Sequence, residues 1–457
     1  MKTFTVLNPA TRQIIATLPS DGPASVAAKY AAARAAQPAW AALPIAERIA
    51  VIKRFRGLLV SQKESLARTL TAEVGKPITQ SRNEVEGVLR RIDFFLQQSV
   101  RVLKPETVLA DQAMTEIITH DALGVVANIS AWNYPYFVGS NVFIPALLAG
   151  NAILYKPSEF ASMTGMAIAR LLQESGVPEA IFALVLGPGA IGAALVKQPV
   201  DGVFFTGSYA TGTKIAALTA GRMIRLQLEL GGKDPIYVCD DVALAQAAGI
   251  ADGAFYNAGQ SCCSVERIYV HQKIFQPFVA AFVAEVKKYR LGDPMQDTTY
   301  IGPLARPAQI QVLAAQVQDA KDRGAKVLTG GRAAPKHPGY FEPTVLVNVT
   351  HEMAVMRDES FGPIIGLMAV PDDETAVKLM NDSEYGLTAG VYTPDEVRAK
   401  RILAQVRCGS AYWNCCDRVS AALPWSGVGK SGVGVTLSKY GIQAFTRPKA
   451  WHLRPPV

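Results

Sequence analysis

The sequence predicts an α/β protein with two doubly wound domains and a small β element, and three observations support this fold class. The chain has 457 residues, 49% of them hydrophobic, which is more than one hydrophobic core usually holds. Residues 24–101 carry apolar side chains at three- and four-residue spacing, the period of amphipathic helices. From residue 124 onward, short apolar runs alternate with helical segments, which is typical of a parallel sheet buried on both faces.

The first series of strands lies between residues 124 and 230. Its apolar runs are "GVVANIS", "NAILYKP", "FALVLG" and "VDGVFFTGS", and the helical segments between them include "ASMTGMAIARLLQESG" and "AIGAALVKQ". Right-handed crossovers through such helices bring consecutive strands into one sheet. We therefore expect the first doubly wound domain here.

A second series follows residue 230. Its predicted strands are "PIYVCD", "RIYVH", "AKVLTGG", "GPIIGLMAV" and "LTAGVYT", with one helix running to about residue 257 and another at "KIFQPFVAAFVAEVKKYR". Between the two series, a Gly pair and a Pro in "LQLELGGKDP" interrupt the periodic pattern. We place the domain boundary after residue 229.

Two segments fit neither series, "MTEIITHDA" at 114–122 and "AFTRPKAWHLRPP" at 444–456. Isolated strands at these positions could pair with each other and with another subunit. We expect residues 104–122 and 431–457 to form a small β element for oligomerisation, in a homodimer or a homotetramer.

Composition narrows the classes of function. The formal net charge of +8 is modest for this length, and no cluster of Lys and Arg with aromatic residues predicts nucleic-acid binding. The N-terminus "MKTFTVLNPATRQ" lacks the apolar core of a secretory signal, and no apolar run approaches the roughly 18 residues of a membrane span. The six cysteines lack CxxC pairs and His partners at zinc spacing. We expect a cytoplasmic protein without a metal site, a disulfide framework or a membrane partner.

Two short motifs could hold a dinucleotide. In "FFTGSYATG", Gly207 and Ser208 form a turn after a strand, and Gly212 lies near a helix start, whose free N–H groups suit a pyrophosphate. The sequence is not GxGxxG, and such a turn can equally serve only to join a strand to a helix. In "YKPSE", Lys156 and Glu159 could hydrogen-bond a ribose diol at the sheet edge, or form a solvated ion pair.

Three polar groups suggest covalent chemistry on a carbonyl. A thiolate from Cys262 or Cys263 needs an amide donor for the developing oxyanion, which Asn133 could supply. A carboxylate such as Glu229 could then activate water to hydrolyse a thioester. Together these groups form the minimum set for oxidising an aldehyde through a covalent intermediate, although spacing alone does not bring them together.

Six motifs occur in a fixed order along the chain: "AWNYP", "YKPSE", "FTGS", "LELGGKDP", "NAGQSCC" and "ESFGP". Through them the chain resembles the aldehyde dehydrogenase superfamily, in its NAD(P)-dependent hydrolytic branch. The resemblance runs from "NPATRQIIA" to "SGVGKSGVGVTLSKYGIQAFTRPK". It implies an aldehyde dehydrogenase-like fold, with a dinucleotide-binding domain at 1–103 and 123–229 and a catalytic domain at 230–430.

The resemblance also implies roles for the catalytic residues. Cys262, the second residue after the Gly-Gln pair, would be the nucleophile, and Asn133 would supply the side-chain half of the oxyanion hole. Glu229 would be the general base, and its presence favours hydrolysis to the free acid. The implied cofactor-binding residues are Trp132, Lys156, Glu159, Gly207, Ser208, Gly212, Glu359 and Phe361. Because the Glu159 carboxylate would repel a 2′-phosphate, we predict NAD as the cofactor, with NADP left open.

The same resemblance implies a substrate pocket lined by Tyr134, Phe137, Val138, Cys263, Arg418, Val419 and Trp425. Its apolar and aromatic character favours a medium-chain or aromatic aldehyde. An inward Arg418 would instead favour an acid semialdehyde such as succinic semialdehyde, and we expect it to point outward. Alternatives from other classes are a non-catalytic structural or binding protein of the same fold and a thiol hydrolase without cofactor.

Overall fold

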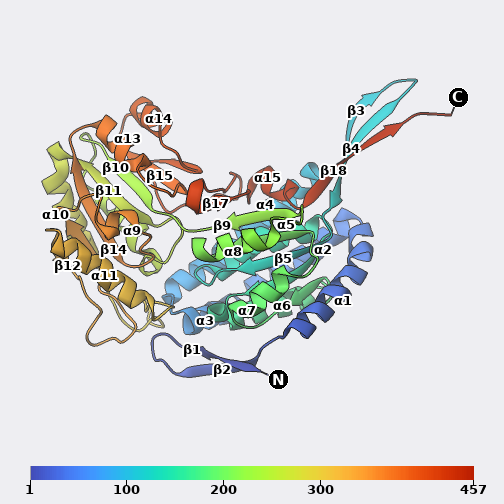
Figure 1. Ribbon diagram of the computed structural model, residues 1–457, viewed down its shortest axis with the longest axis horizontal. Coiled ribbons are helices and arrows are strands. Elements are labelled where there is room, and N and C mark those ends of the chain that lie inside the picture. Colours follow the sequence, from blue (N-terminus) through green and yellow to red (C-terminus); the bar gives the residue numbers. More distant parts are fainter. Residues whose placement is uncertain (1, 457) are drawn as a thin grey trace.

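The computed structural model describes residues 2–456, and it begins with a hairpin that the sequence analysis did not predict. Strands β1 (Thr3–Leu7) and β2 (Ile14–Pro19) pair antiparallel and lie beneath the rest of the chain in Figure 1. The expected helices follow as α1 (Pro23–Ala42), α2 (Ile45–Ser61), α3 (Lys63–Val74) and α4 (Ile78–Val102). On α4 the fully buried residues recur at helical spacing, at Val85, Val88, Ile92 and Phe95.

The first large sheet has the strand order β17-β9-β8-β5-β6-β7. Its parallel strands are β5 (Val125–Ser130), β6 (Ala152–Pro157), β7 (Phe182–Leu184), β8 (Gly202–Thr206) and β9 (Arg225–Glu229). The chain moves outward in one direction from β5 to β7 and returns on the other side of β5 with β8 and β9. The order therefore reverses between β5 and β8, the point at which doubly wound sheets bind ligands.

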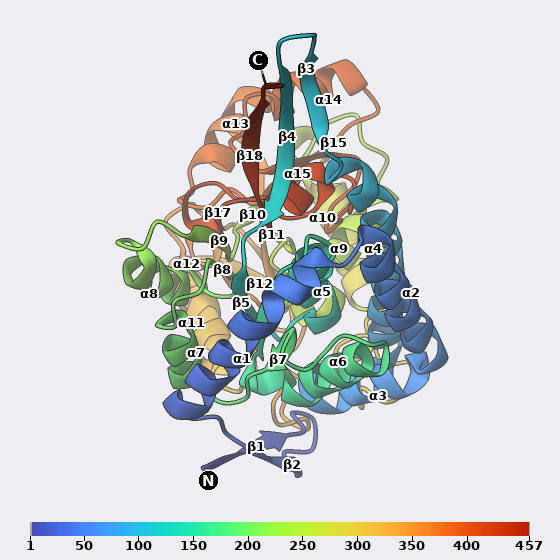
Figure 2. The same ribbon diagram turned by 90° about the vertical axis from the view of Figure 1, so that its right-hand side faces the viewer.

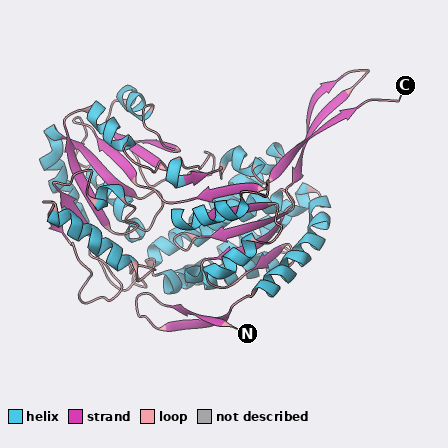
Figure 3. Ribbon diagram, viewed as in Figure 1, coloured by secondary structure: helices cyan, strands magenta, loops and turns pink. Residues whose placement is uncertain are grey.

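Four helices connect these strands: α5 (Pro135–Leu148), α6 (Ser162–Glu174), α7 (Gly189–Val196) and α8 (Tyr209–Thr219). Right-handed crossovers place α5 and α6 on one face and α7 and α8 on the other. Helices α2, α3 and α4 back the first pair, whereas α1 contacts α7. The predicted doubly wound α/β fold is confirmed, and Figure 3 shows helices on both sides of the strands.

The second large sheet has the order β12-β13-β14-β11-β10-β15-β16 and is parallel apart from β12. Its strands are β10 (Asp234–Val238), β11 (Val265–His271), β12 (Lys326–Thr329), β13 (Thr344–Val347), β14 (Ile364–Val370), β15 (Thr388–Tyr392) and β16 (Ser410–Trp413). Its helices are α9 (Gln246–Phe255), α10 (Phe275–Val286), α11 (Gln309–Asp322), α12 (Ala354–Arg357), α13 (Asp373–Asn381) and α14 (Glu396–Leu403). Each large sheet has a hydrophobic core of its own.

The third sheet is antiparallel, with the order β18-β4-β3, and protrudes from the molecule as an arm (Figures 1 and 2). It consists of β3 (Glu106–Ala110), β4 (Thr115–Ala122) and β18 (Thr446–Leu453). The predicted pairing of the two isolated segments is confirmed, since Trp451 lies opposite Ile117.

The predicted β element at 431–457 is too long at its start. Strand β17 (Gly432–Val433) pairs antiparallel with β9 and completes the first large sheet. Helix α15 (Ser438–Gln443) contacts α4 and α5. Since Ile442 and Phe445 are fully buried in the first core, the chain leaves that core only at β18. No helix within residues 2–456 combines the length and apolar character needed to cross a membrane.

Candidate active site

The two large sheets meet at a narrow cavity of about 280 Å³. The first sheet contributes residues that follow its strands, including Asn133 after β5 and Gly207 after β8. The second sheet contributes residues that precede its strands, including Cys262 before β11 and Phe361 before β14. The carboxyl ends of one sheet therefore face the amino ends of the other across this cavity.

The loop that carries Cys262 is fixed by its own hydrogen bonds. Asn257 and Ala258 both have φ of 54°, and the Asn257 side chain donates to the carbonyl of Gln260 at 3.1 Å. The side-chain N–H of Gln260 donates to the Asn257 carbonyl at 3.0 Å. The side-chain oxygen of Gln260 accepts the Ala305 N–H. A Cβ at Gly259 would lie 2.4 Å from the carbonyl oxygen of Gly362, so this turn requires glycine. The loop thus holds Cys262 at a fixed place.

Asn133 lies beside this loop. Its side-chain N–H donates to the Gln260 carbonyl at 3.2 Å, and only 4% of the residue is exposed. The carboxamide is thereby directed toward the backbone that leads into Cys262, where an amide donor can meet the oxyanion that forms on a carbonyl oxygen when the sulfur bonds to the carbonyl carbon.

A wider cavity of about 720 Å³ lies on the other side of Cys262. Cys262 lines both cavities and is half-buried. Every residue predicted for the substrate pocket lines the wide cavity: Tyr134, Phe137, Val138, Cys263, Arg418, Val419 and Trp425. Five residues predicted to bind the cofactor line the narrow cavity with Asn133: Trp132, Gly207, Ser208, Glu359 and Phe361. The Cys262 thiol thus lies where the predicted substrate residues and the predicted cofactor residues meet.

The turn that bears Glu359 and Phe361 is positioned by Glu266 of β11. The Glu266 carboxylate accepts the N–H groups of Ser360 at 2.8 Å and Phe361 at 2.9 Å, and pairs with the Lys233 ammonium at 2.7 Å. Phe361 has φ of 47°, and its ring meets that of Trp132 edge to face at 5.6 Å. Sequence reasoning missed Glu266, which lies in no motif, and it gave no role to Lys233, although that residue lies within "LELGGKDP".

The glycine pair between the domains leaves room for this turn and for the Cys262 loop. A Cβ at Gly231 would lie 2.1 Å from a carboxylate oxygen of Glu359, and one at Gly232 would lie 2.8 Å from the Cys262 carbonyl. The Glu359 carboxylate accepts the Gly232 N–H at 3.1 Å. Burial raises the pKa of Glu359 to about 7.

Three predicted cofactor residues lie outside the narrow cavity. The Lys156 ammonium is buried at the end of β6, where it donates to the Pro157 carbonyl at 3.1 Å and where burial lowers its pKa. Glu159 lines a separate cavity of about 640 Å³ beside the β1–β2 hairpin. A Cβ at Gly212 would lie 2.7 Å from Leu230, so this glycine lets α8 pack closely on the end of β9.

Glu229 ends β9 but lines neither of the cavities that meet at Cys262. Its carboxyl group lies against Gln227, Thr436 and Trp425, and burial raises the pKa of Glu229 to about 8. Trp425 also lines the wide cavity, so the Glu229 carboxyl contacts a residue of that cavity's wall without lining the cavity itself. The structure therefore leaves the carboxyl near the site, without contact to Cys262.

The wall of the wide cavity contains a stack that sequence reasoning missed. The rings of Tyr134 and Phe137 are parallel, with centroids 5.8 Å apart. The Lys76 ammonium lies 3.6 Å from the Tyr134 centroid, and the Arg91 guanidinium lies 4.0 Å from that of Phe137. Glu84 pairs with Lys76 and also accepts the N–H that opens α5. Two cation–π contacts thus anchor both predicted aromatic residues.

Cys263 is held away from reaction. Its thiol donates to the Asp417 carboxylate at 3.1 Å, and the Ser261 hydroxyl donates to the same oxygen at 3.0 Å. The adjacent Cys262 and burial raise the pKa of Cys263. Burial raises the pKa of Asp417 to about 7. Cys263 therefore remains a thiol, and sequence reasoning missed Asp417 as its partner.

Two guanidinium groups lie at the mouth of the wide cavity. Arg90 and Arg418 both line it and are both exposed. Among the ion pairs of residues 2–456, none engages either side chain. Arg418 is thus exposed and also borders the pocket.

Comparison with known proteins agrees with this arrangement. A family model described as "Aldehyde dehydrogenase family" matches residues 1–451. A Mycolicibacterium smegmatis protein named "Putative succinate-semialdehyde dehydrogenase" and specified as NADP(+)-using is 37% identical over 456 residues, covering 97% of this chain and 88% of its own length. A betaine aldehyde dehydrogenase of Cereibacter sphaeroides is 35% identical, covering 97% and 92%. The crystal structure of an NAD-dependent aldehyde dehydrogenase from Sinorhizobium meliloti has a TM-score of 0.96 at 32% identity, covering 100% of this chain and 92% of that one.

Proposed function

The chain belongs to the aldehyde dehydrogenase family, and we propose that it oxidises an aldehyde to the carboxylic acid with NAD through a thioester on Cys262. The observation that carries this proposal is the place of Cys262 between two cavities. One cavity is lined by the predicted substrate residues, and the other by Asn133, Glu359 and Phe361.

The narrow cavity suits a dinucleotide. Gly207 and Ser208 stand at the N-terminus of α8, which has free N–H groups for a pyrophosphate. A Cβ at Gly207 would lie 2.5 Å from the Phe205 ring, so a side chain at this turn would displace that ring. The half-buried Glu359 carboxylate can accept ribose hydroxyls. The bound cofactor would supply the hydride acceptor.

The chain supplies the remaining chemistry. The Cys262 thiolate forms a bond to the aldehyde carbon, and the Asn133 carboxamide and the Cys262 N–H stabilise the oxyanion. After oxidation to the thioester, Glu229 takes a proton from water while the water oxygen bonds to the carbonyl carbon. The C–S bond then breaks, which releases the acid and restores the Cys262 thiolate. For this step the Glu229 side chain moves from its contacts with Gln227, Thr436 and Trp425 toward the thioester.

Initial rates test the proposal directly. NADH and NADPH formation is measured with aliphatic aldehydes, aromatic aldehydes and succinic semialdehyde, with Cys262→Ala as the control. We expect Cys262-dependent NADH formation with medium-chain or aromatic aldehydes. If no aldehyde yields reduced cofactor, the protein is a non-catalytic member of the fold and the proposal is wrong.

A second candidate substrate is an acid semialdehyde such as succinic semialdehyde. The observation in its favour is the pair Arg90 and Arg418, whose guanidinium groups at the cavity mouth have no carboxylate partner among the described residues. A distal carboxylate on the substrate could pair with them. The name of the M. smegmatis relative points to the same substrate.

Butanal and succinic semialdehyde separate the two candidates because they have equal chain length and differ in the carboxylate. In the acid-semialdehyde case, Arg90→Gln with Arg418→Gln raises the KM for the semialdehyde by about tenfold or more and leaves that for butanal unchanged. Equal effects on both substrates would exclude this candidate.

We also propose that the protein is a cytoplasmic homo-oligomer, a dimer or a tetramer, assembled through the β3–β4–β18 arm. Every residue of β3 is exposed, including Val108 and Leu109, and an exposed apolar edge strand favours pairing with another chain. Sedimentation at micromolar concentration tests this, and a monomer alone would contradict it. Fractionation of cells tests the location.

A further inference from the structure

A buried guanidinium in the wall of the wide cavity has no carboxylate partner. Arg91 of α4 lines that cavity, and only 7% of the residue is exposed. Within residues 2–456 its guanidinium makes one hydrogen bond, from Nη1 to the Asn141 side-chain oxygen at 2.8 Å, and no ion pair. A buried charge costs free energy unless it is paired, so we expect an anion to complete this site.

The guanidinium keeps its charge inside the cavity. Burial lowers the pKa of Arg91 to about 10, so the group stays protonated at neutral pH. The Glu84 carboxylate opposes this shift, but it pairs with the Lys76 ammonium and accepts the Tyr136 N–H at 2.9 Å. Glu84 is therefore engaged elsewhere, and the Arg91 charge is left for a ligand.

Packing fixes the plane of the guanidinium. It lies 4.0 Å from the centroid of the Phe137 ring. Gly87 precedes Arg91 by one helical turn on α4, and a Cβ there would lie 2.6 Å from the same ring, so a side chain at Gly87 would displace it. Since only Nη1 is bonded to Asn141, the Nε and Nη2 atoms can donate to a ligand. A planar guanidinium held in this way can bind a carboxylate through two parallel hydrogen bonds.

Arg91 also lies near the nucleophile. After burial and Glu84, the next influences on the pKa of Arg91 are Cys263 and Cys262, whose negative charge raises it. The guanidinium is thus within electrostatic range of both thiols. Arg90 and Arg418 are exposed at the mouth of the same cavity, whereas Arg91 is buried in its wall. A carboxylate bound to Arg91 would therefore lie deeper than the mouth, close to an aldehyde carbon at Cys262.

Resting on the proposed function, we propose that Arg91 binds the carboxylate of the aldehyde substrate, with Asn141 holding the guanidinium, and that the substrate is a short acid semialdehyde. Arg91 is then a specificity-determining residue, because it contacts the end of the substrate that does not react. This choice favours the second candidate substrate above. A buried guanidinium selects a carboxylate more strongly than exposed ones do, since solvent screens the exposed charges.

Butanal and succinic semialdehyde again serve as matched substrates of equal chain length. We expect Arg91→Gln to raise the KM for succinic semialdehyde by about tenfold to a hundredfold, because a charge-assisted pair of hydrogen bonds is lost. The KM for butanal should change by about threefold or less. Arg91→Lys keeps the charge without the planar fork, so it should restore only part of the loss.

A second variant keeps Arg91 and decides the question if Arg91→Gln does not fold. Asn141→Asp preserves the side-chain size and places a carboxylate beside the guanidinium, where it competes with that of the substrate. We expect the KM for succinic semialdehyde to rise by about tenfold, with a change of about threefold or less for butanal. Arg90→Gln is the matched control on the same helix. Because Arg90 is exposed, its loss should raise the KM for the semialdehyde by about threefold or less.

A binding measurement tests the same site without turnover. Succinate is titrated by calorimetry into the Cys262→Ala protein with NAD present, because this variant cannot form the thioester. We expect succinate to bind, and we expect the dissociation constant to rise by about tenfold or more when Arg91→Gln is added.

Each other outcome overturns a defined claim. If Arg91→Gln raises the KM for both aldehydes equally, Arg91 acts by packing on Phe137 and the carboxylate site is wrong. If neither KM changes, or if succinate binds equally well without Arg91, the carboxylate site is wrong and the proposed oxidation stands. If succinate binds through Arg91 but no aldehyde gives Cys262-dependent NADH, the proposed function is wrong, and the semialdehyde assignment is wrong with it.

Discussion

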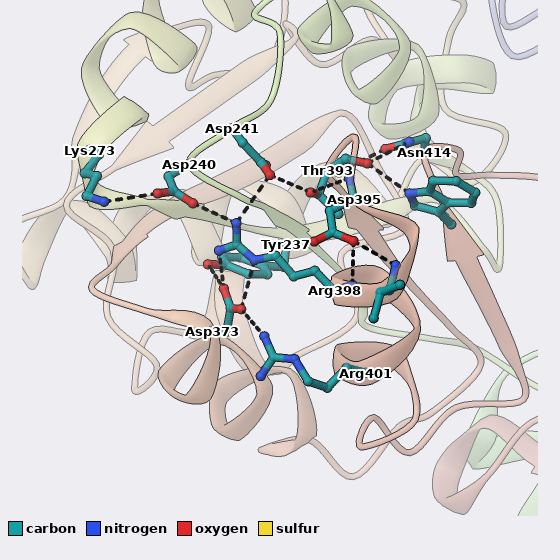
Figure 4. Close-up of polar contacts among 12 residues, drawn as sticks. Tyr237, Asp240, Asp241, Lys273, Asp373, Thr393, Asp395, Arg398, Arg401 and Asn414 are labelled. Atoms are coloured by element: carbon teal, nitrogen blue, oxygen red, sulfur yellow. Dashed lines mark hydrogen bonds and ion pairs between the residues drawn. The ribbon is translucent and has the colours of Figure 1, made fainter.

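The two edges of the second large sheet, one formed by the amino ends of its strands and the other by their carboxyl ends, differ in the side chains that lie there. The amino-end edge bears Cys262 before β11 and Phe361 before β14, both of which face the narrow cavity. The carboxyl-end edge bears Asp240 after β10 and Asp373 after β14, which meet the Arg398 guanidinium (Figure 4). Open α/β sheets usually bind ligands at the carboxyl ends, and residues at the carboxyl ends of the first sheet line the narrow cavity here. The second sheet reverses the rule because its amino ends face the first sheet.

Electrostatics at the two edges differ in the same way. Around the cavities, burial raises the pKa of Glu229 to about 8 and that of Glu359 to about 7. At the opposite edge, Arg398 lowers the pKa of Asp240 to about 2. Carboxyl groups with raised pKa values are typical of reactive sites, and carboxylates paired with arginine are typical of structural networks. One edge is therefore suited to chemistry and the other to stability, and variants at each edge test that division.

The largest effect is expected from Cys262→Ala. Loss of the proposed nucleophile would remove the covalent route, so turnover should fall by about four orders of magnitude or more. The adjacent Cys263→Ala serves as the matched control and should keep most of the activity, because the Cys263 thiol is bound to Asp417. The measurement is NADH formation with a reactive aldehyde. Equal losses in both variants would show that the two thiols act together.

The next effect is expected from Asn133→Ala. An oxyanion-hole donor contributes about 3 to 4 kcal/mol, so turnover should fall by about a hundredfold or more. The free energy of unfolding should change little, since the side chain makes one hydrogen bond, to the Gln260 carbonyl. Near-normal turnover would exclude Asn133 from the oxyanion hole.

A smaller effect is expected from Glu159→Gln. The carboxylate should repel the 2′-phosphate of NADP, so its removal should raise kcat/KM for NADP relative to NAD by about tenfold. The ratio is measured with one aldehyde and both cofactors. An unchanged ratio would mean that Glu159, which lies outside the narrow cavity, does not contact the adenosine ribose.

How far the sequence predicts this site depends on where each residue lies. Asn133 and Cys262 belong to motifs at strand ends, so the strand pattern and the motif together indicate their place. Arg91 lies on α4 and Lys76 lies in the short connection between α3 and α4, and at both kinds of position a charged residue normally predicts exposure. Arg91 is buried because its guanidinium donates to Asn141 at 2.8 Å and lies over Phe137, contacts that join residues about fifty positions apart. No local sequence pattern predicts such long-range contacts.

The orientation of the second sheet relative to the first domain also cannot be predicted from the sequence. The sequence predicts its strands, but nothing in an apolar run shows which end of the sheet will face the first domain. The start of the arm is another example, since β17 joins β9 through a backbone pairing of only two residues. Such short pairings depend on the position of the whole sheet. The predicted start of the β element at residue 431 is therefore too early in the chain.

Almost no effect on turnover is expected from Arg398→Gln at the opposite edge. Arg398 bonds Asp240 at 2.8 Å and Asp373 at 2.6 and 2.9 Å, and Tyr237 donates to Asp373 (Figure 4). Its loss should lower the free energy of unfolding by about 1 to 3 kcal/mol. Arg401→Gln is the matched control, because within residues 2–456 Arg401 forms an ion pair only with Asp373 and its side chain is 59% exposed. Arg401→Gln should lower the free energy of unfolding, measured with urea, by less than about 1 kcal/mol.

Lower pH tests the same contrast, because the Arg398 network should lose its contribution to the free energy of unfolding in a defined range of pH. A carboxyl group whose folded pKa is lowered stabilises the fold above its unfolded pKa of about 3.9 and ceases to do so as the pH falls through the folded value. For Asp240 that value is about 2, and the hydrogen bond from Arg398 is the main cause. The difference in unfolding free energy between wild type and Arg398→Gln should therefore be largest near neutral pH. It should shrink between about pH 4 and pH 2. A difference that stays constant across this range would show that Arg398 stabilises the edge by packing, and the electrostatic contrast between the two edges would no longer hold.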